Sequence, residues 1–133
     1  MDMNEIEVDV LIIGAGPSGC VAASYLHNQG KRIKVVEKSK FPRFVIGESL
    51  LPRCMDHFEE VGLLDVIKDY GFEIKKGARF LRDDIVCNFD FSKKFGEGWD
   101  WTWQVPRADF DKTLADEVIN KGIDLEFEAE VTA

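Results

Sequence analysis

A glycine-rich hexapeptide near the start of the chain has the residue types that bind a phosphate group. Gly14-Ala15-Gly16-Pro17-Ser18-Gly19 fits the spacing G-x-G-x-x-G. In such a loop the first glycine permits a tight turn, the second lets the backbone approach a pyrophosphate, and the third lets a helix pack closely on a strand. The N–H groups at the start of that helix then face the phosphates. The hexapeptide therefore predicts a dinucleotide site, provided that a strand precedes it and a helix follows it.

The neighbouring residues provide this strand and this helix. Residues 8–13 are apolar and β-branched, which predicts a buried strand. Residues 17–29 predict a helix, since a proline suits its first turn and a glycine follows its end. A second short strand at 33–37 completes a βαβ unit with parallel strands, and it ends on an acid, Glu37. A carboxylate at that point binds ribose hydroxyls and disfavours a 2′-phosphate.

The later part of the chain predicts an antiparallel insertion and then a return to the parallel sheet. The elements expected are a long connection at 38–52, helices at 53–61 and 63–70, antiparallel strands at about 72–106, a helix at 109–121 and a strand at 125–131. Apolar residues that alternate with period two predict the antiparallel strands, and an amphipathic stripe of apolar residues predicts the last helix. We therefore predict an α/β fold: a Rossmann-type βαβ unit with an inserted antiparallel sheet. A complete sheet of this class needs further parallel strands, so residues 1–133 are expected to be the N-terminal portion of a larger two-domain protein, with a substrate domain downstream.

Charge and composition exclude several functions. The formal net charge of -8 repels a phosphate backbone and argues against nucleic-acid binding. The three cysteines are odd in number and widely spaced, so neither a disulfide framework nor a metal site is predicted, and a reducing cytoplasm is the simplest compartment. Residues 1–7 lack the basic start of a signal peptide, and no membrane span is predicted.

Four further segments make the chain resemble a known group of proteins. They are 41–52 (F-P-R-F-V-I-G-E-S-L-L-P), 71–78 (G-F-E-I-K-K-G-A), 101–106 (W-T-W-Q-V-P) and 106–111 (P-R-A-D-F-D). With the glycine loop they resemble the FAD-dependent oxidoreductases of the p-hydroxybenzoate-hydroxylase-fold superfamily. Within it, the chain is most similar to flavin-dependent, tryptophan-type halogenases and to geranylgeranyl-reductase-like flavoproteins, over essentially its whole length. The resemblance implies that the dinucleotide is FAD.

The resemblance also implies which residues contact FAD outside the glycine loop. These candidates are Glu37, Lys38, Arg43, Gly47, Ser49, Arg107 and Val131. The 41–52 loop would run beside the flavin, and Arg107 at a helix entrance would meet the ribose or the diphosphate. Val131 would touch the adenine through its backbone. The residue types alone also allow a plain surface loop, a capped helix start and a buried strand valine at these places.

Two residues are candidates for catalysis. In the halogenases an active-site lysine precedes an x-Gly pair, which selects Lys75 over Lys76 here, with Glu48 as its candidate ion-pair partner. In that chemistry reduced FAD reacts with oxygen and chloride to give hypochlorous acid, which the lysine captures or hydrogen-bonds. The residues alone also allow two solvated lysines at the start of a strand. The alternating tryptophans of 99–103 are predicted to share one face of a strand. They are either a halogenase signature or side chains that pack in the core.

These features together predict an enzyme, an FAD-dependent oxidoreductase of the monooxygenase and halogenase group. Its substrate would be an aromatic or otherwise electron-rich small molecule, and its electrons would come from NAD(P)H or from a separate flavin reductase. Two alternatives stay open. One is a geranylgeranyl-reductase-like flavoprotein that reduces isoprenoid double bonds, and the other is a non-enzymatic dinucleotide-binding module.

Overall fold

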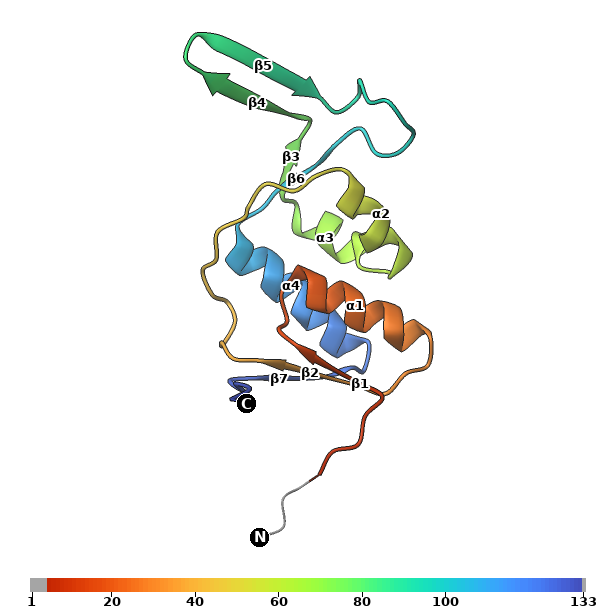
Figure 1. The fold of residues 1–133 in the computed structure, drawn as a ribbon. Helices are drawn as coiled ribbons and strands as arrows, with labels where there is room; N and C mark the ends of the chain where they lie inside the picture. Colours follow the sequence, from red (N-terminus) through yellow and green to blue (C-terminus); the bar gives the residue numbers. More distant parts are fainter. Residues whose placement is uncertain (1–4, 133) are drawn as a thin grey trace.

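In the computed structural model, which describes residues 5–132, helices α1 and α4 pack on one face of a parallel sheet (Figure 1). The strands are β1 (Val10–Ile13), β2 (Ile33–Glu37), β3 (Glu73–Lys75), β4 (Gly77–Arg82), β5 (Ile85–Asp90), β6 (Thr102–Gln104) and β7 (Asp124–Phe127). The helices are α1 (Pro17–Asn28), α2 (Arg53–Glu60), α3 (Leu64–Tyr70) and α4 (Arg107–Asn120). The parallel sheet has the order β1-β2-β7, which confirms the predicted βαβ unit and α/β fold.

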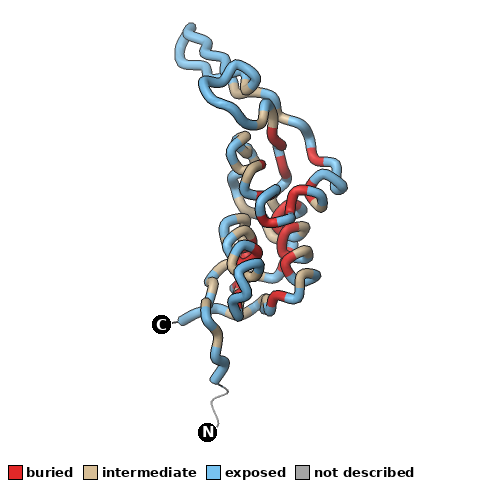
Figure 2. The backbone as a smooth tube through the Cα atoms, turned by 90° about the vertical axis from the view of Figure 1, so that its right-hand side faces the viewer, coloured by how far each residue is buried: buried red, intermediate tan, exposed pale blue. Residues whose placement is uncertain are grey.

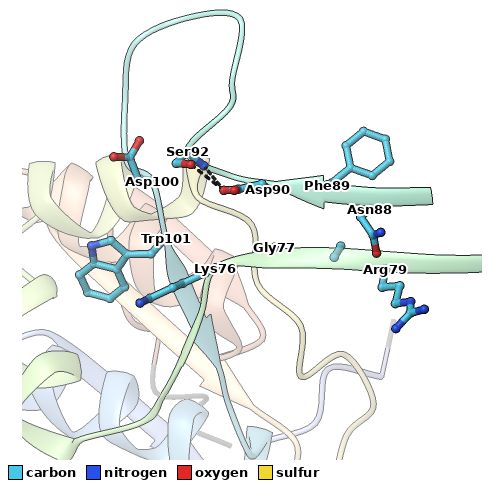
Figure 3. A pocket seen from close by; sticks show the side chains of 10 residues that line it. Lys76, Gly77, Arg79, Asn88, Phe89, Asp90, Ser92, Asp100 and Trp101 are labelled. Carbon is cyan, nitrogen blue, oxygen red and sulfur yellow. Dashed lines mark hydrogen bonds between the residues drawn. The ribbon is translucent and has the colours of Figure 1, made fainter. Parts of the chain in front are cut away.

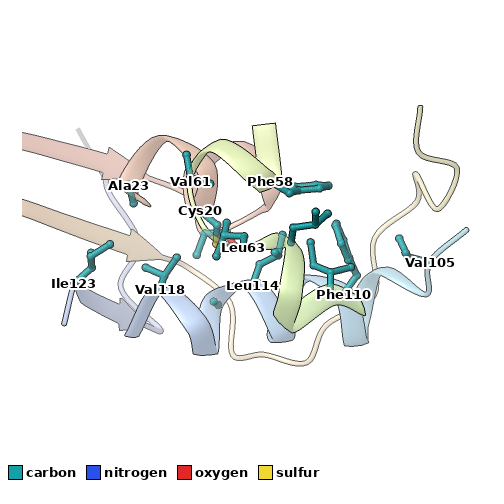
Figure 4. Close-up of a cluster of buried hydrophobic side chains, with 14 of the residues drawn as sticks. Cys20, Ala23, Phe58, Val61, Leu63, Val105, Phe110, Leu114, Val118 and Ile123 are labelled. Carbon is teal, nitrogen blue, oxygen red and sulfur yellow. Dashed lines mark hydrogen bonds between the residues drawn. The ribbon is translucent and has the colours of Figure 1, made fainter. Parts of the chain in front are cut away.

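The hydrophobic core lies between the parallel sheet and the helices and continues under α2 and α3. Cys20 from α1, Val35 from β2 and Phe110 from α4 are all fully buried there. Helix α4 presents Phe110, Leu114 and Val118 to the core, at the spacing of successive helical turns (Figure 4). Burial of each of the larger side chains stabilises the fold by about 1.5–3 kcal/mol. The buried residues gather in this layer, whereas β5 and most of β4 are exposed (Figure 2).

The inserted strands form two separate sheets instead of the single antiparallel sheet that was expected. Strand β3 pairs with β6, while β4 and β5 form a hairpin that projects away from the parallel sheet (Figure 1). Residues 91–101 form turns and irregular chain, so Trp99 and Trp101 lie outside β6. The Trp101 ring nevertheless meets the rings of Trp99 and Trp103 edge to face, at centroid distances of 5.6 and 5.1 Å. Ring packing therefore aligns the three tryptophans without a continuous strand.

Several element boundaries also differ from the prediction, and two of them lie at expected FAD contacts, Arg107 and Val131. Helix α4 begins at Arg107, directly after Pro106, and not at residue 109. Strand β7 ends at Phe127 and does not reach Val131, because Glu128 has φ 57 and leaves the extended conformation.

Neither a membrane-spanning helix nor a metal cluster occurs in the part of the chain that the structure describes. No helix within residues 5–132 has the length and apolar character needed to cross a membrane. Over the same range, no group of three or more His, Cys, Asp or Glu side chains is arranged to hold a metal ion.

Candidate functional site

The glycine loop connects β1 to α1, and backbone packing requires one of its glycines. A Cβ on Gly19 would lie 2.0 Å from the carbonyl oxygen of Gly14, so no side chain fits there. Gly14 itself has φ +106, a conformation that residues with a side chain rarely adopt. A Cβ on Gly16 would meet only the Arg43 guanidinium, at 3.8 Å. The backbone at Gly16 is therefore open to a close approach by another group.

Helix α1 directs its free amides toward this opening. The first hydrogen bond of the helix runs from the Cys20 N–H to the Gly16 carbonyl at 2.9 Å. The N–H groups of Ser18 and Gly19 precede that bond and have no partner within the helix, and Pro17 has no N–H to satisfy. Two free amides and the positive end of a helix form an anion site of the kind that holds a diphosphate.

Glu37 holds the glycine loop against the end of β2. Its carboxylate is buried and accepts hydrogen bonds from the N–H groups of Ala15 and Ser39, both at 2.9 Å. A cavity of about 380 Å³ opens beside it. The cavity is lined by Ile13, Gly14, Val36, Glu37, Lys38, Ala129, Glu130 and Val131. Four residues expected to contact the nucleotide thus border one cavity at the edge of the parallel sheet.

Two arginines from distant parts of the chain share one buried carboxylate. Arg43 donates to Oδ2 of Asp111 at 2.5 Å, while Arg107 donates from Nε to Oδ1 at 2.8 Å and from Nη2 to Oδ2 at 3.0 Å. Asp111 is 1% exposed. Arg107 also donates to the Gly47 carbonyl at 3.3 Å, and a Cβ on Gly47 would lie 3.0 Å from that guanidinium. The structure therefore brings the predicted residues Arg43, Gly47 and Arg107 together.

Asp111 was not among the site residues expected from the sequence. An acid near a helix start interacts favourably with the helix dipole, and this alone is enough to account for its residue type. The available signal was its spacing of four residues from Arg107, which places the two side chains on one face of α4. The link to Arg43 joins residues 68 positions apart and depends on the fold.

Lys75 lies where three of the segments singled out in the sequence converge. Its ammonium donates to the Ser49 hydroxyl at 2.6 Å and to the Leu50 carbonyl at 3.0 Å. The register of β3 against β6 sets Lys75 opposite Thr102, between two of the tryptophans. Ser49 forms a β-bridge with Gln104 on the same strand. The G-E-S-L-L-P loop and the W-x-W-x-V-P strand thus both border the lysine.

Glu48 does not form the ion pair with Lys75 that was expected. Within residues 5–132 its carboxylate accepts a hydrogen bond from the Gly47 N–H at 3.0 Å, and no salt bridge joins it to Lys75. The Glu48 carbonyl accepts from the Val105 N–H at 2.8 Å, which fixes the backbone there. The backbone N–H of Gly47, with that of Glu48 and the nearby Arg107, lowers the Glu48 pKa. Glu48 and Arg107 instead border a cavity of about 490 Å³.

The Cys20 thiol lies beneath the glycine loop but is not reactive. Its Sγ donates to the Ala15 carbonyl at 3.3 Å. Burial, followed by the charges of Asp111 and Glu37, raises the pKa of this thiol to about 12. The thiol stays protonated at neutral pH, so Cys20 packs the helix against the loop and is no nucleophile.

A further hollow of about 590 Å³ lies on the β4–β5 hairpin (Figure 3). It is lined by Lys76, Gly77, Ala78, Arg79, Asn88, Phe89, Asp90, Ser92, Asp100 and Trp101. None of the residues predicted for the cofactor or for catalysis belongs to it. Its lining includes Lys76, the neighbour of Lys75, but neither Lys75 itself nor any residue of the glycine loop.

The residues at the glycine loop fit a bound FAD. The loop leaves room at Gly16, offers free amides at the start of α1, and has a buried carboxylate and an open cavity at the tip of β2. Residues 7–133 match the family model described as FAD binding domain. The chain belongs to this family of FAD-binding domains. This result confirms FAD as the cofactor predicted for the chain.

The relatives of this FAD-binding domain include halogenases. The chain is 33% identical over 120 residues to flavin-dependent halogenase armH3 from Armillaria mellea. The aligned region covers 89% of this chain and 23% of that relative. It is 34% identical over 114 residues to tryptophan 2-halogenase from Chondromyces crocatus, and that alignment covers 86% of this chain and 21% of the relative. The crystal structure of a flavoprotein/dehydrogenase from Cytophaga hutchinsonii superposes with a TM-score of 0.90 at 60% identity, over 95% of this chain and 31% of that one.

These comparisons confirm the resemblance to flavin-dependent halogenases and to the superfamily that contains them. They give no support to the isoprenoid reductase or to the non-enzymatic module. The chain spans less than a quarter of the length of the two halogenases, at 23% and 21%.

Proposed function

We propose that this FAD-binding domain is part of an FAD-dependent halogenase or monooxygenase that acts on an aromatic or otherwise electron-rich small molecule. The observation that carries the proposal is the convergence on Lys75. Its ammonium lies 2.6 Å from the Ser49 hydroxyl and 3.0 Å from the Leu50 carbonyl, on a strand paired with the tryptophan segment. The halogenase relatives support the same reaction class.

The domain's own residues hold the cofactor in this proposal. Bound FAD supplies the redox chemistry, while the protein binds it and orients it. The Ser18 and Gly19 amides and the opening at Gly16 hold the diphosphate. Glu37 has lone pairs beyond its two backbone hydrogen bonds, and these accept the ribose hydroxyls. The cavity bordered by Lys38 and Val131 receives the adenosine.

Lys75 has the proposed catalytic role. Two acceptors fix its Nζ, so the group is oriented before any reactant arrives. An amine held this way can donate a hydrogen bond to hypohalous acid. In its neutral form it can instead attack the halogen, so that the oxygen–halogen bond breaks, a nitrogen–halogen bond forms and water is released. That bond breaks as the halogen passes to the substrate carbon, and the proton lost from this carbon returns to the nitrogen. Glu48 faces Arg107 and not the lysine, so its contribution is to the shape of the loop.

The remaining partners are proposed at the level of the whole protein. The chain spans 23% and 21% of the two halogenase relatives, and a substrate domain downstream of residue 133 would complete the substrate pocket. Electrons would come from NAD(P)H or from a separate flavin reductase. The three cysteines are free, which supports a reducing compartment such as the cytoplasm.

A halogenation assay on the full-length protein tests the proposal. The purified protein should show the visible spectrum of bound FAD and form a halide-dependent product from an electron-rich aromatic when reduced flavin and oxygen are supplied. Lys75→Ala should abolish the halogenated product and leave FAD bound and reducible. Lys76→Ala, at the exposed neighbouring position, should keep the activity and serves as the control.

Three outcomes would contradict parts of this proposal. A colourless protein that takes up no FAD would contradict the cofactor assignment. Halogenation by the Lys75→Ala variant would remove Lys75 from the mechanism. Reduction of an isoprenoid double bond under anaerobic conditions, with no halide-dependent product, would favour the reductase instead.

A further inference from the structure

Asp111 is a buried charge whose two partners both lie at the cofactor site. It is 1% exposed, and the side chains of Arg43 and Arg107 are 21% and 16% exposed. The three hydrogen bonds, at 2.5, 2.8 and 3.0 Å, use both carboxylate oxygens. A buried carboxylate is costly to desolvate and is retained only when such partners compensate for the loss of water.

The two guanidinium groups lie beside glycines of the expected cofactor site, so their ion pairs with Asp111 concern this site as well as the stability of the fold. The Arg43 guanidinium is 3.8 Å from the position that a Cβ would occupy on Gly16, the glycine that leaves room for the diphosphate. The Arg107 guanidinium is 3.0 Å from the place of a Cβ on Gly47, in the loop expected beside the flavin. Asp111 also lies close enough to Cys20, in the first turn of α1, to contribute to the raised pKa of that thiol, after the larger effect of burial.

We propose that Asp111 is a positioning residue for FAD: it holds Arg43 in a fixed orientation beside the glycine loop, ready for the diphosphate, and Arg107 beside Gly47, in the loop expected next to the flavin. The inference rests on FAD binding at this loop. Two like charges at one place repel each other, and the carboxylate between them offsets that repulsion. The three groups together keep one net positive charge for the anionic cofactor.

Two physical effects of Asp111 oppose each other, and their difference makes the proposal testable. Removing the carboxylate would make the site more positive and would on that ground tighten the binding of an anion. It would also free two long side chains, whose fixed rotamers must then be regained on binding. The positioning role predicts that the second effect is larger, so FAD should bind more weakly although the site gains positive charge.

The experiment compares Asp111→Asn with Asp116→Asn in the full-length protein. Asp116 lies on the same helix and pairs with Lys112 at the same spacing of four residues, but at the surface. FAD and ADP are titrated into each apoprotein, and the melting temperature of each apoprotein is measured. We expect Asp111→Asn to raise the Kd of FAD and of ADP about tenfold in an apoprotein that still folds, with a lower melting temperature because the arginines lose charge-assisted hydrogen bonds. Asp116→Asn should match the wild type.

A second variant keeps the test decisive if Asp111→Asn does not fold. Asp111→Glu retains the charge but displaces it by one methylene, so FAD binding should weaken at least about threefold in a folded apoprotein. Wild-type or tighter FAD binding in either folded variant would overturn the positioning role. Failure of both variants to fold would also overturn it, because Asp111 would then act in the fold alone. A wild-type protein that binds no FAD would instead contradict the proposed function.

Discussion

Gly16 and Gly19 lie in one loop, but a Cβ would meet different neighbours at the two positions. At Gly19 it would lie 2.0 Å from a backbone carbonyl that cannot move without shifting the end of β1. We expect Gly19→Ala to destabilise the apoprotein by about 3 kcal/mol, as over-packing does. At Gly16 the nearest atom is a guanidinium nitrogen at 3.8 Å, so Gly16→Val should leave the apoprotein stable and block FAD binding.

Melting curves and FAD titrations on the two variants check this difference. The Gly19→Ala apoprotein should unfold at a lower temperature, whereas the Gly16→Val apoprotein should melt like the wild type and remain colourless with added FAD. Normal FAD binding by Gly16→Val would show that the diphosphate does not approach this glycine.

At the same scale, single residues explain why the site was only partly predictable. The glycine loop and Glu37 were predictable because their spacing along the chain follows from one βαβ unit. The contact between Arg43 and Asp111 spans 68 positions and is visible only after the long loop has packed on α4. Glu48 was assigned to Lys75 because both residues belong to halogenase-like segments, but backbone hydrogen bonds at Gly47 and Val105 direct it elsewhere.

At the scale of elements, the β4–β5 hairpin is built almost entirely from contacts within itself. All residues of β5 are exposed, and the hairpin projects from the rest of the molecule (Figure 1). At its base a Cβ on Gly77 would lie 2.2 Å from the Phe89 carbonyl oxygen, across the strand pair. Gly77→Ala should therefore disrupt the hairpin without unfolding the parallel sheet or α4.

Hydrogen exchange measured element by element tests this independence. Amides of β4 and β5 should exchange faster in Gly77→Ala, while those of α4 should keep their wild-type rates. Gly96→Ala is the matched control, because that glycine has open space around its Cβ position in the loop after the hairpin. Loss of protection in α4 would show that the hairpin and the core unfold together.

The hairpin also shows where reasoning from strand patterns fails. Alternating apolar residues predicted strands where β4 and β5 lie, but alternation along a chain does not specify which strands pair. The turns at 91–101 separate β5 from β6, so β6 pairs with β3 and the hairpin stands apart. The period of the tryptophans matched a strand, yet two of the three align through ring contacts outside it.

At the scale of the whole molecule, the parallel sheet is covered on one face only. Helices α1 and α4 pack on that face, and no helix or strand among residues 5–132 lies on the other (Figure 1). On the open face Leu11 is 52% exposed and Ile13 is 65% exposed. Parallel strands with apolar residues on both faces normally carry a layer on each side. We therefore expect chain beyond residue 133 to cover this face in the full-length protein.

A charged side chain on the open face distinguishes a covered face from an exposed one. Leu11 is the position chosen, since Ile13 lines the cavity beside Glu37 and Leu11 does not. In residues 1–133 alone, Leu11→Lys should change the free energy of unfolding by no more than about 0.5 kcal/mol, as surface substitutions do. In the full-length protein the same lysine would be buried without a partner and should destabilise the fold by about 3 kcal/mol or more. Denaturant unfolding of both proteins, each with and without the substitution, measures the two differences. Equal small effects in both would mean that the sheet keeps this face in solvent and that the substrate domain packs elsewhere.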